Sequence, residues 1–492
     1  MTTPEEQPKT PALGAKGAWT AALIVMAISL LATFTLSSPP QSPTGTRAAN
    51  LDNDAPQEED AVDVPTDTAV AGGPADPGTS GPKTVGGKTY DCSKGQNAGA
   101  SDIGVTGREI RFAATVVKSG IAKDFLSDSQ FGMEAVRQKV NRAGGICGRI
   151  LKIDYVDDGW DPDTGGRYIQ RFIGEKKYFG LAVNPSSEGL RNAIGGGAIR
   201  NAGFPVIGAD GMLIGQYKDP WVWPVATSTS SIMHVMAQNA WARGARSFGI
   251  VWESNYRFGV EGHDAFVGTI SRLGGKISSD IPVQGGQNSY KNQADEFIGK
   301  CGGVNSLNQC DFLAILLEPN TASQWVRDGG LGNGTVRPKI GIGGPQPLFL
   351  DSFARDCGKF CANMWVWTSF KPPIPPFDTD PAVVTYKNAL AQVSATADKN
   401  NPHVEGAYVG MMLVVEALKK LGPAPTREGL RAVLDAMTFD TGLAPPLVFK
   451  PGNHFSNVSG QAFEAIVNNG SFANWRYTNS GFIADKEVGK DI

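Results

Sequence analysis

The segment from residue 108 to residue 158 constrains the fold more than any other part of the chain. It begins with a run of β-branched and apolar residues, passes through a polar loop into a helical pattern, and ends in a second β-branched run. Phe131, Ala135 and Val140 recur at helical spacing. Gly145 then offers the left-handed conformation that ends many helices. A strand, a helix and a strand in this order form a βαβ unit, which predicts a parallel sheet.

Short apolar runs continue to alternate with helical patterns along the chain, so the expected fold class is α/β. At 492 residues the chain exceeds what one hydrophobic core usually holds, and two lobes are expected. Further strands are expected at residues 178–183, 204–207, 247–252, 311–317, 340–342, 364–367, 446–449 and 463–467. Further helices are expected at residues 193–201, 231–243, 383–397, 405–421 and 427–437.

This order of strands and helices closely resembles the Leu/Ile/Val-binding family of type I periplasmic binding proteins over residues 110–477. The resemblance implies two Rossmann-like lobes joined by a hinge that the chain crosses three times. The crossings are expected near Thr227, Ser369 and Pro446. Each lobe is then discontinuous, with residues 108–227 and 369–445 in the first lobe and residues 228–368 and 446–492 in the second.

An uncharged apolar run of nineteen residues occupies residues 18–36, which is long enough to span a bilayer. Lys9 and Lys16 precede it, so residues 1–17 are expected in the cytoplasm and the bulk of the chain outside. We predict a transmembrane anchor that holds the protein at the extracytoplasmic face of a bacterial plasma membrane. A cleaved signal, which would leave a secreted protein, is the alternative, although the run lacks an obvious small-x-small cleavage site.

Residues 37–91 change to Pro, Gly, Ala, Thr and acidic residues, with few aromatic or large aliphatic side chains. A segment of this composition cannot bury enough apolar surface to fold by itself. We therefore predict a disordered stalk that holds the folded part of the protein away from the membrane.

The chain has six cysteines, and an even number suggests three disulfides in an exported protein. Closeness in the sequence favours two short pairs and leaves the other two cysteines to each other. The expected pairs are Cys301 with Cys310, Cys357 with Cys361, and Cys92 with Cys147. A zinc site is the rival interpretation, but the chain has no CxxC pair and its four histidines are scattered. We therefore predict no metal site.

The motifs of common enzymes are missing from the sequence. There is no GxGxxG after a strand, no GxxxxGK[ST], no GxSxG and no HExxH, so nucleotide-dependent enzymes, hydrolases and metalloproteases have no supporting motif. Gly195, Gly196 and Gly197 lack the lysine and the spacing of a phosphate loop. A net charge of −3 does not indicate the basic face of a nucleic-acid-binding protein. We predict a protein that is not an enzyme, has no cofactor and binds no nucleic acid.

Loops at the carboxyl ends of parallel strands are where open α/β sheets bind ligands. The resemblance places Ser186 at the family serine that holds a ligand carboxylate through its hydroxyl and backbone N–H, with Ser187 beside it. Phe125 falls where the family often has an aromatic residue that covers the ligand. Either Tyr256 or Phe258 is expected at the opposite lip, in the second lobe.

Several positions depart from the amino-acid-binding pattern. Asp210 and Gly211 stand where the family offers a backbone oxygen and a threonine hydroxyl. Glu318 replaces a residue that is usually aromatic, and Gln346 replaces the acid that pairs the ligand ammonium. Glu318 is expected to face the positive end of the ligand, with a helix-capping role as the alternative. Trp160 follows a strand end and is expected either to stack on an aromatic or cationic ligand or to pack in the core.

These features predict an extracytoplasmic solute-binding protein that closes around one small polar ligand, such as an amino acid, an amide or a small organic acid. The expected partners are this small molecule and the permease subunits of a branched-chain-type ABC importer, with membrane contact through the N-terminal helix. The alternative is a membrane-tethered sensor or receptor module with the same fold, which would pass its closure to a signalling protein.

Overall fold

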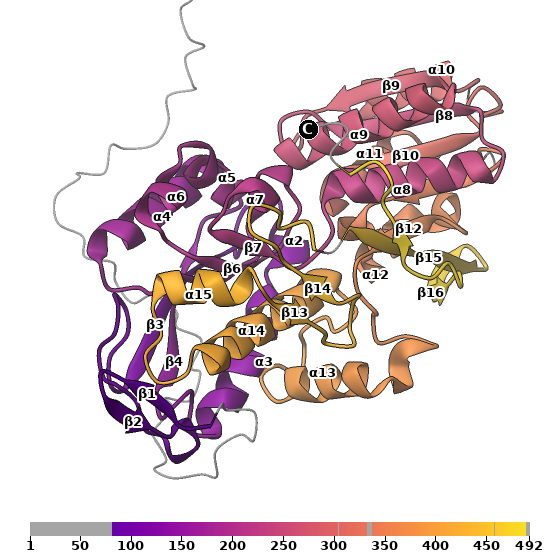
Figure 1. The fold of residues 1–492 in the computed structure, drawn as a ribbon. Coiled ribbons are helices and arrows are strands. Elements are labelled where there is room, and N and C mark those ends of the chain that lie inside the picture. The colour runs from indigo at the N-terminus through magenta and orange to yellow at the C-terminus, as the bar shows by residue number, and fades with distance from the viewer. Residues whose placement is uncertain (1–80, 304, 332–336, 457, 489–492) are drawn as a thin grey trace, which may run out of the picture. The chain divides into compact units, whose positions relative to one another are not determined.

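The computed structural model describes residues 81–303, 305–331, 337–456 and 458–488, all of which belong to one compact unit. The expected membrane anchor at residues 18–36 and most of the expected stalk lie outside these residues. Within the part of the chain that the structure describes, no helix combines the length and the apolar character that a membrane span requires. This part forms two α/β lobes, each with its own sheet and its own hydrophobic core (Figure 1).

The first lobe is built on a five-stranded sheet in which all neighbouring strands are parallel, as the βαβ pattern predicts. Its strands are, in spatial order, β4 (Ile150–Asp157), β3 (Glu109–Val116), β5 (Leu181–Asn184), β6 (Val206–Ala209) and β7 (Val222–Pro224). The helices of this lobe are α2 (Lys123–Leu126), α3 (Ser129–Arg142), α4 (Pro162–Glu175), α5 (Ser187–Gly195), α6 (Ala198–Ala202), α7 (Ile214–Lys218), α13 (Pro381–Ala391), α14 (Pro402–Leu421) and α15 (Arg427–Leu434).

Helices cover both faces of this sheet, with α4 and α5 on one side and α3 and α14 on the other (Figure 1). Local sequence fixes where two of them begin. The side chain of Asp161 accepts the N–H of Thr164 at 2.8 Å, and the side chain of Asn401 accepts the N–H of His403 at 2.9 Å. Proline follows each capping residue, at the first helical position that tolerates it. The cap at Asn401 brings the first turn of α14 against the ends of β5 and β6.

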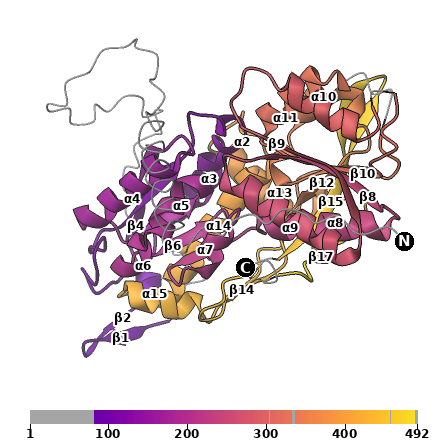
Figure 2. The same ribbon diagram turned by 90° about the horizontal axis from the view of Figure 1, so that it is seen from above.

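The second lobe has an eight-stranded mixed sheet, with helices α8 and α9 on one side and α10 and α11 on the other (Figure 2). Its strands are, in spatial order, β16 (Ser471–Tyr477), β15 (Ser459–Asn468), β12 (Trp365–Thr368), β11 (Gly341–Gly344), β10 (Phe312–Leu316), β8 (Ser247–Glu253) and β9 (Lys276–Val283), with β17 (Ile483–Ala484) paired to β15. Its helices are α8 (Thr229–Ala242), α9 (Arg257–Leu273), α10 (Lys291–Lys300), α11 (Pro319–Asp328) and α12 (Asp351–Cys357).

Three chain segments pass between the two cores and are joined at Thr227. The backbone N–H of Thr227 donates to the hydroxyl oxygen of Ser369 at 2.9 Å, and its hydroxyl donates to the carbonyl oxygen of Ser459 at 2.6 Å. All three residues are buried. Phe449 still packs in the core of the first lobe, so the third crossing lies between Phe449 and Ser459 and not at Pro446.

The expected boundary at residue 446 is therefore wrong. The apolar run at residues 446–449 contributes β14 (Leu447–Val448), which pairs antiparallel with β13 (Thr438–Phe439) and not with the second sheet. Leu447 is buried in the first core while Val448 is exposed, which is the alternation of a strand with one covered face. The first lobe thus keeps this hairpin.

The folded part also begins earlier than expected. Residues at the end of the expected stalk form a hairpin of β1 (Lys83–Val85) and β2 (Lys88–Tyr90). Composition does not reveal these strands, because three-residue strands rich in lysine and threonine carry little apolar surface. The Nζ of Lys83 donates to the carbonyl oxygen of Lys420 at 2.6 Å, which attaches the hairpin to the end of α14.

The three expected disulfides are confirmed: Cys92–Cys147, Cys301–Cys310 and Cys357–Cys361. The first of them joins the N-terminal segment to the loop between α3 and β4. Its cysteines are 55 residues apart, whereas those of the other two pairs are 9 and 4 residues apart. Because the entropy that a cross-link removes from the unfolded chain grows with loop length, the first disulfide should stabilise the fold most.

Replacing Cys92 and Cys147 together by serine should lower the free energy of unfolding by about 4 kcal/mol, from the chain entropy of the long loop. The matched control, Cys301→Ser with Cys310→Ser, should lower it by about 2.5 kcal/mol, because its loop is shorter. Urea unfolding of the full-length chain in detergent, followed by tryptophan fluorescence, measures both values. Equal losses in the two double variants would contradict the argument from loop length.

Candidate functional site

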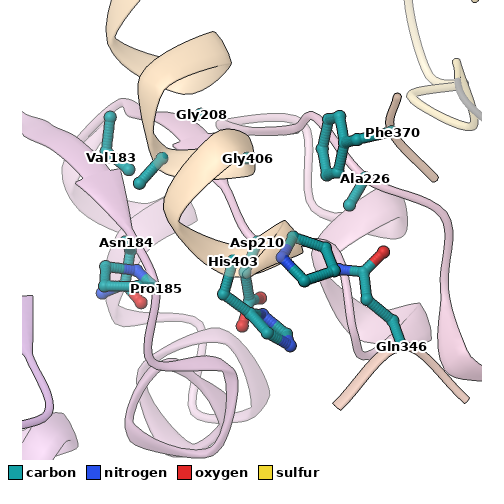
Figure 3. A pocket seen from close by; sticks show the side chains of 12 residues that line it. Val183, Asn184, Pro185, Gly208, Asp210, Ala226, Gln346, Phe370, His403 and Gly406 are labelled. Atoms are coloured by element: carbon teal, nitrogen blue, oxygen red, sulfur yellow. The ribbon is translucent and has the colours of Figure 1, made fainter. Parts of the chain in front are cut away.

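The carboxyl ends of β5 and β6 and the first turn of α14 enclose a cavity (Figure 3). Asn184, Asp210 and His403 line it from the first lobe. Gln346 lines it from the second lobe, and Phe370 from the second crossing. In this structure the enclosed space holds about one water molecule. Residues from both lobes therefore meet at the ends of parallel strands, which is where open α/β sheets bind ligands.

Ser186 is fully buried, and both of its donors are bonded within the first lobe. Its backbone N–H donates to Oδ1 of Asn184 at 2.9 Å, and its hydroxyl donates to Oδ1 of Asp158 at 2.8 Å. Burial raises the pKa of Asp158 to about 6, although the hydrogen bond from Ser186 works in the opposite direction. Ser186 was expected to hold a ligand carboxylate. Its hydroxyl would have to give up the hydrogen bond to Asp158 to do so.

Asp210 faces the start of α5, whose first residue is Ser187. The side-chain amide of Gln216 donates to Oδ1 of Asp210 at 2.9 Å, and the N–H of Met212 donates to the same oxygen at 3.3 Å. Burial raises the pKa of Asp210 to about 7, while Gln216, Met212 and the hydroxyl and N–H of Ser187 lower it. The other oxygen, Oδ2, is enclosed and has no partner of ordinary hydrogen-bond geometry among the described residues.

Gly211 shapes the loop that presents Asp210. Its φ is +79°, and a Cβ at this position would lie 2.5 Å from the hydroxyl oxygen of Tyr217, so only glycine fits. The N–H of Gly211 donates to Oε1 of Gln216 at 2.7 Å. Gly211 thereby fixes the amide of Gln216, which in turn bonds to Asp210.

The expected aromatic residues pack against one another where the lobes meet. Trp160 stacks on Tyr256 with ring centroids 4.8 Å apart. The ring of Trp160 also lies 5.5 Å from that of Phe258 and 5.7 Å from that of Phe125. Both alternatives for the opposite lip, Tyr256 and Phe258, therefore contact the first lobe. These four rings contact one another and do not line the cavity, but Phe125 packs 5.3 Å from the ring of His403, which does.

Glu318 caps helix α11 and does not line the cavity. Its carboxylate accepts the backbone N–H of Asn320 at 2.8 Å and that of Thr321. The expectation that Glu318 faces a ligand is therefore replaced by its alternative, helix capping. The physical reason is that the first N–H groups of a helix lack intrahelical partners, and Pro319 fixes the start of this helix.

Glu253, at the end of β8, lies beside Glu318 and was not among the expected site residues, and it does not line the cavity. It is fully buried, and its Oε2 accepts the N–H of Glu318 at 2.7 Å. Burial, together with the charges of Glu318 and Glu188, raises the pKa of Glu253 to about 8. The signal that could have found it is a lone acid at the carboxyl end of a fully apolar strand.

Gln346 joins the cavity to the hinge. Its Oε1 accepts the N–H of Ser369 at 3.0 Å and the hydroxyl of Thr368 at 3.3 Å. Because this oxygen is occupied, the amide NH₂ is the group that Gln346 can offer to a ligand.

His403, in the first turn of α14, was also not expected at the site. It is 5% exposed, and burial lowers its pKa to about 3, so its ring is uncharged at neutral pH. Its Nε2 has no hydrogen-bond partner among the described residues. The Asn401-Pro402 pair before it signals a helix start, but no local pattern indicates which strands end beside that helix.

Two carboxylates cap helices of the opposite lobe. Glu188 of the first lobe accepts the N–H groups of Arg257, at 2.5 Å, and of Phe258, at 3.2 Å, in the first turn of α9. Glu261, on α9, accepts the N–H of Ile214 in the first lobe at 2.8 Å. The residues that precede α9 and α7 supply no side-chain cap of their own. Each lobe therefore provides the N-terminal cap for a helix of the other lobe. Burial raises the pKa of both glutamates.

These features define a class of protein. Two α/β lobes that share three crossings and meet over a small polar cavity have the architecture of a type I periplasmic binding protein. Among the described residues, no group of histidine, cysteine and acidic side chains is arranged to hold a metal ion.

The chain belongs to the periplasmic binding protein family, whose model matches residues 109–464. No curated protein matches the sequence at a significant level. The predicted family is thereby confirmed, while the identity of the ligand is left open.

Solved structures share this fold at low sequence identity. A possible leucine/isoleucine/valine-binding protein from Rhodopirellula baltica is 17% identical, with a TM-score of 0.62 over 77% of this chain and 98% of that one. A fatty acid ABC transporter substrate-binding protein from Thermomonospora curvata is 16% identical, with a TM-score of 0.64 over 79% and 94%. An ABC transporter solute-binding protein from R. palustris in complex with 4-hydroxybenzoate is 15% identical, with a TM-score of 0.61 over 77% and 99%.

The raised pKa of Glu253 predicts a loss of stability at high pH. Its pKa rises from 4.5 to about 8 on folding, so the native state binds this proton more tightly than the unfolded state does. The contribution is complete below the unfolded pKa and is lost as the pH rises through the folded pKa, which lowers the free energy of unfolding between about pH 5 and about pH 8.

Glu253→Gln should make this decline shallower, because the glutamine cannot ionise. Urea unfolding at several pH values in this range measures the slope. Glu296→Gln, which changes an exposed glutamate paired with Lys300, is the control and should leave the slope unchanged. An identical slope in Glu253→Gln and in the unaltered protein would contradict the prediction.

Proposed function

We propose that this protein is an extracytoplasmic solute-binding protein that closes its two lobes around one small polar organic ligand. The observation that carries the proposal is the cavity, where Asp210 and His403 of the first lobe meet Gln346 of the second. A ligand held between both halves binds the closed arrangement better than the open one, and this difference shifts the population towards closure.

The contacts between the lobes support a reversible closure. They include hydrogen bonds, notably those of Glu188 and Glu261, stacked rings such as Trp160 on Tyr256, and further apolar side chains of the first lobe, such as Leu213, that pack in the core of the second. The hydrogen-bonding groups are solvated again when the lobes separate, so each of these bonds contributes only modestly to stability. The apolar contacts favour the closed arrangement, and a ligand adds its differential affinity for that arrangement to them.

We further propose that the protein delivers its ligand to the permease subunits of an ABC importer, and that residues 18–36 anchor it to the membrane. The three similar structures described above are a possible leucine/isoleucine/valine-binding protein, a fatty acid ABC transporter substrate-binding protein and an ABC transporter solute-binding protein in complex with 4-hydroxybenzoate. This range of ligands supports a common delivery role with a ligand that varies from one protein to another.

Amide hydrogen exchange tests the closure on whichever solute raises the melting temperature of the full-length chain in a screen of amino acids, amides, organic acids and amines. The N–H groups of Arg257, Phe258 and Ile214 should exchange more slowly with this solute present, because closure places each against a carboxylate of the opposite lobe.

Glu188→Ala should remove the protection of Arg257 and Phe258 but leave that of Ile214, and it should weaken binding by about fivefold through the lost cap. Glu416→Ala, on an exposed face of α14, is the control. Unchanged exchange at all three amides in the presence of a bound solute would contradict closure.

A further inference from the structure

We infer that the ligand of this cavity carries an organic ammonium group and no carboxylate, an inference that rests on the proposed binding function. The structure assigns Asp210 as the partner of the ammonium and His403 as an acceptor for one of its N–H groups.

The two donors of Ser186, which the resemblance assigns to a ligand carboxylate, are engaged within the first lobe. The hydroxyl of Ser186 donates to Asp158 at 2.8 Å, and its N–H donates to Asn184 at 2.9 Å. The hydroxyl of Ser187, at the start of α5, donates to Sδ of Met212 at 3.6 Å, and Ser187 also lowers the pKa of the neighbouring Asp210 carboxyl. Asp210 stands beside this helix end and is partly ionised at neutral pH, because burial raises its pKa to about 7, so a carboxylate brought by a ligand would meet its repulsion.

Two acceptor atoms at the site receive no hydrogen bond from the residues that the structure describes. Oδ2 of Asp210 and Nε2 of His403 are enclosed, and neither has a hydrogen-bond partner among the described residues. His403 is 5% exposed and lines the cavity, and Figure 3 shows its ring on the same side of the cavity as Asp210. A buried acceptor without a donor costs free energy, which a ligand N–H would recover.

No basic side chain compensates Asp210. The residues that line the cavity include no lysine and no arginine, and the groups that act on Asp210 are the neutral donors of Gln216, Met212 and Ser187. An ammonium group would supply the missing positive charge through a charge-assisted hydrogen bond. Phe370 also lines the cavity, and an aromatic ring is a side chain to which a cation is attracted.

Probes that carry only an ammonium group or only a carboxylate test the two groups separately. 3-Methylbutylamine and 4-hydroxybenzylamine carry the ammonium alone, whereas 4-methylpentanoate and 4-hydroxybenzoate carry the carboxylate alone. Thermal shift and calorimetry on the full-length chain in detergent should show binding of at least one amine and of neither acid. Asp210→Asn keeps the shape of the side chain but removes its charge, and it should weaken amine binding by about tenfold to a hundredfold.

Two further variants keep the test specific. Asp219→Asn is the matched control, since Asp219 is also a buried acid of the first lobe with a raised pKa caused by burial, but it does not line the cavity. This variant should leave amine binding unchanged. Asp210→Ala removes the carboxyl that would repel an acid and should allow 4-methylpentanoate or 4-hydroxybenzoate to bind.

The inference is overturned if either acid binds the unaltered chain as well as the amines do, if Asp210→Asn retains the affinity for the amines, or if neither amine binds. The wider solute screen then shows whether the proposed binding function fails as well. A non-amine solute that protects the three amides between the lobes would leave the proposed binding function standing, whereas the absence of any such solute would remove both.

Discussion

The two hydrogen bonds of Thr227 hold all three crossings at one point, and the arrangement of the lobes depends on them. Its N–H reaches Ser369 and its hydroxyl reaches Ser459, so one buried residue joins segments that are 142 and 232 positions away in the sequence. Ser369 is shared with the cavity, because its own N–H donates to Gln346. The hinge and the candidate site are therefore connected through a single serine, and a movement of either one alters the hydrogen bonds of the other.

Buried acids dominate the electrostatics where the lobes meet. Burial raises the pKa of Asp158, Asp210 and Glu253, and the charges of Glu188 and Glu318 raise that of Glu253 further. A carboxyl group that is removed from water without a compensating charge costs free energy. The same cost provides selectivity, since a ligand of the right charge is needed to offset it.

The fold could be predicted from the sequence further than the site could. Strand and helix periodicity is local, and this is why the parallel sheet of the first lobe and its βαβ start were predicted. Strand β9 was missed because Lys276–Val283 alternates polar and apolar residues with little continuous apolar character. The site depends on partners far apart in the chain, such as Glu253 with Glu318 at a separation of 65 residues and Glu188 with Arg257 at 69. No local pattern encodes such pairs. For Glu318, which the sequence does single out, ligand contact and helix capping are both compatible with the local pattern.

Helix α9 takes part in both of the caps that cross between the lobes. Its first turn gives N–H groups to Glu188, and Glu261, one turn further along, receives the N–H of Ile214. Because a rigid helix carries both contacts, a rotation that separates one pair also separates the other. The two caps are therefore formed together when the lobes approach and lost together when the lobes separate, and their N–H groups and carboxylates return to water as one set. Helix α9 thereby couples two hydrogen-bonded sites that lie on different segments of the first lobe, so that neither changes alone.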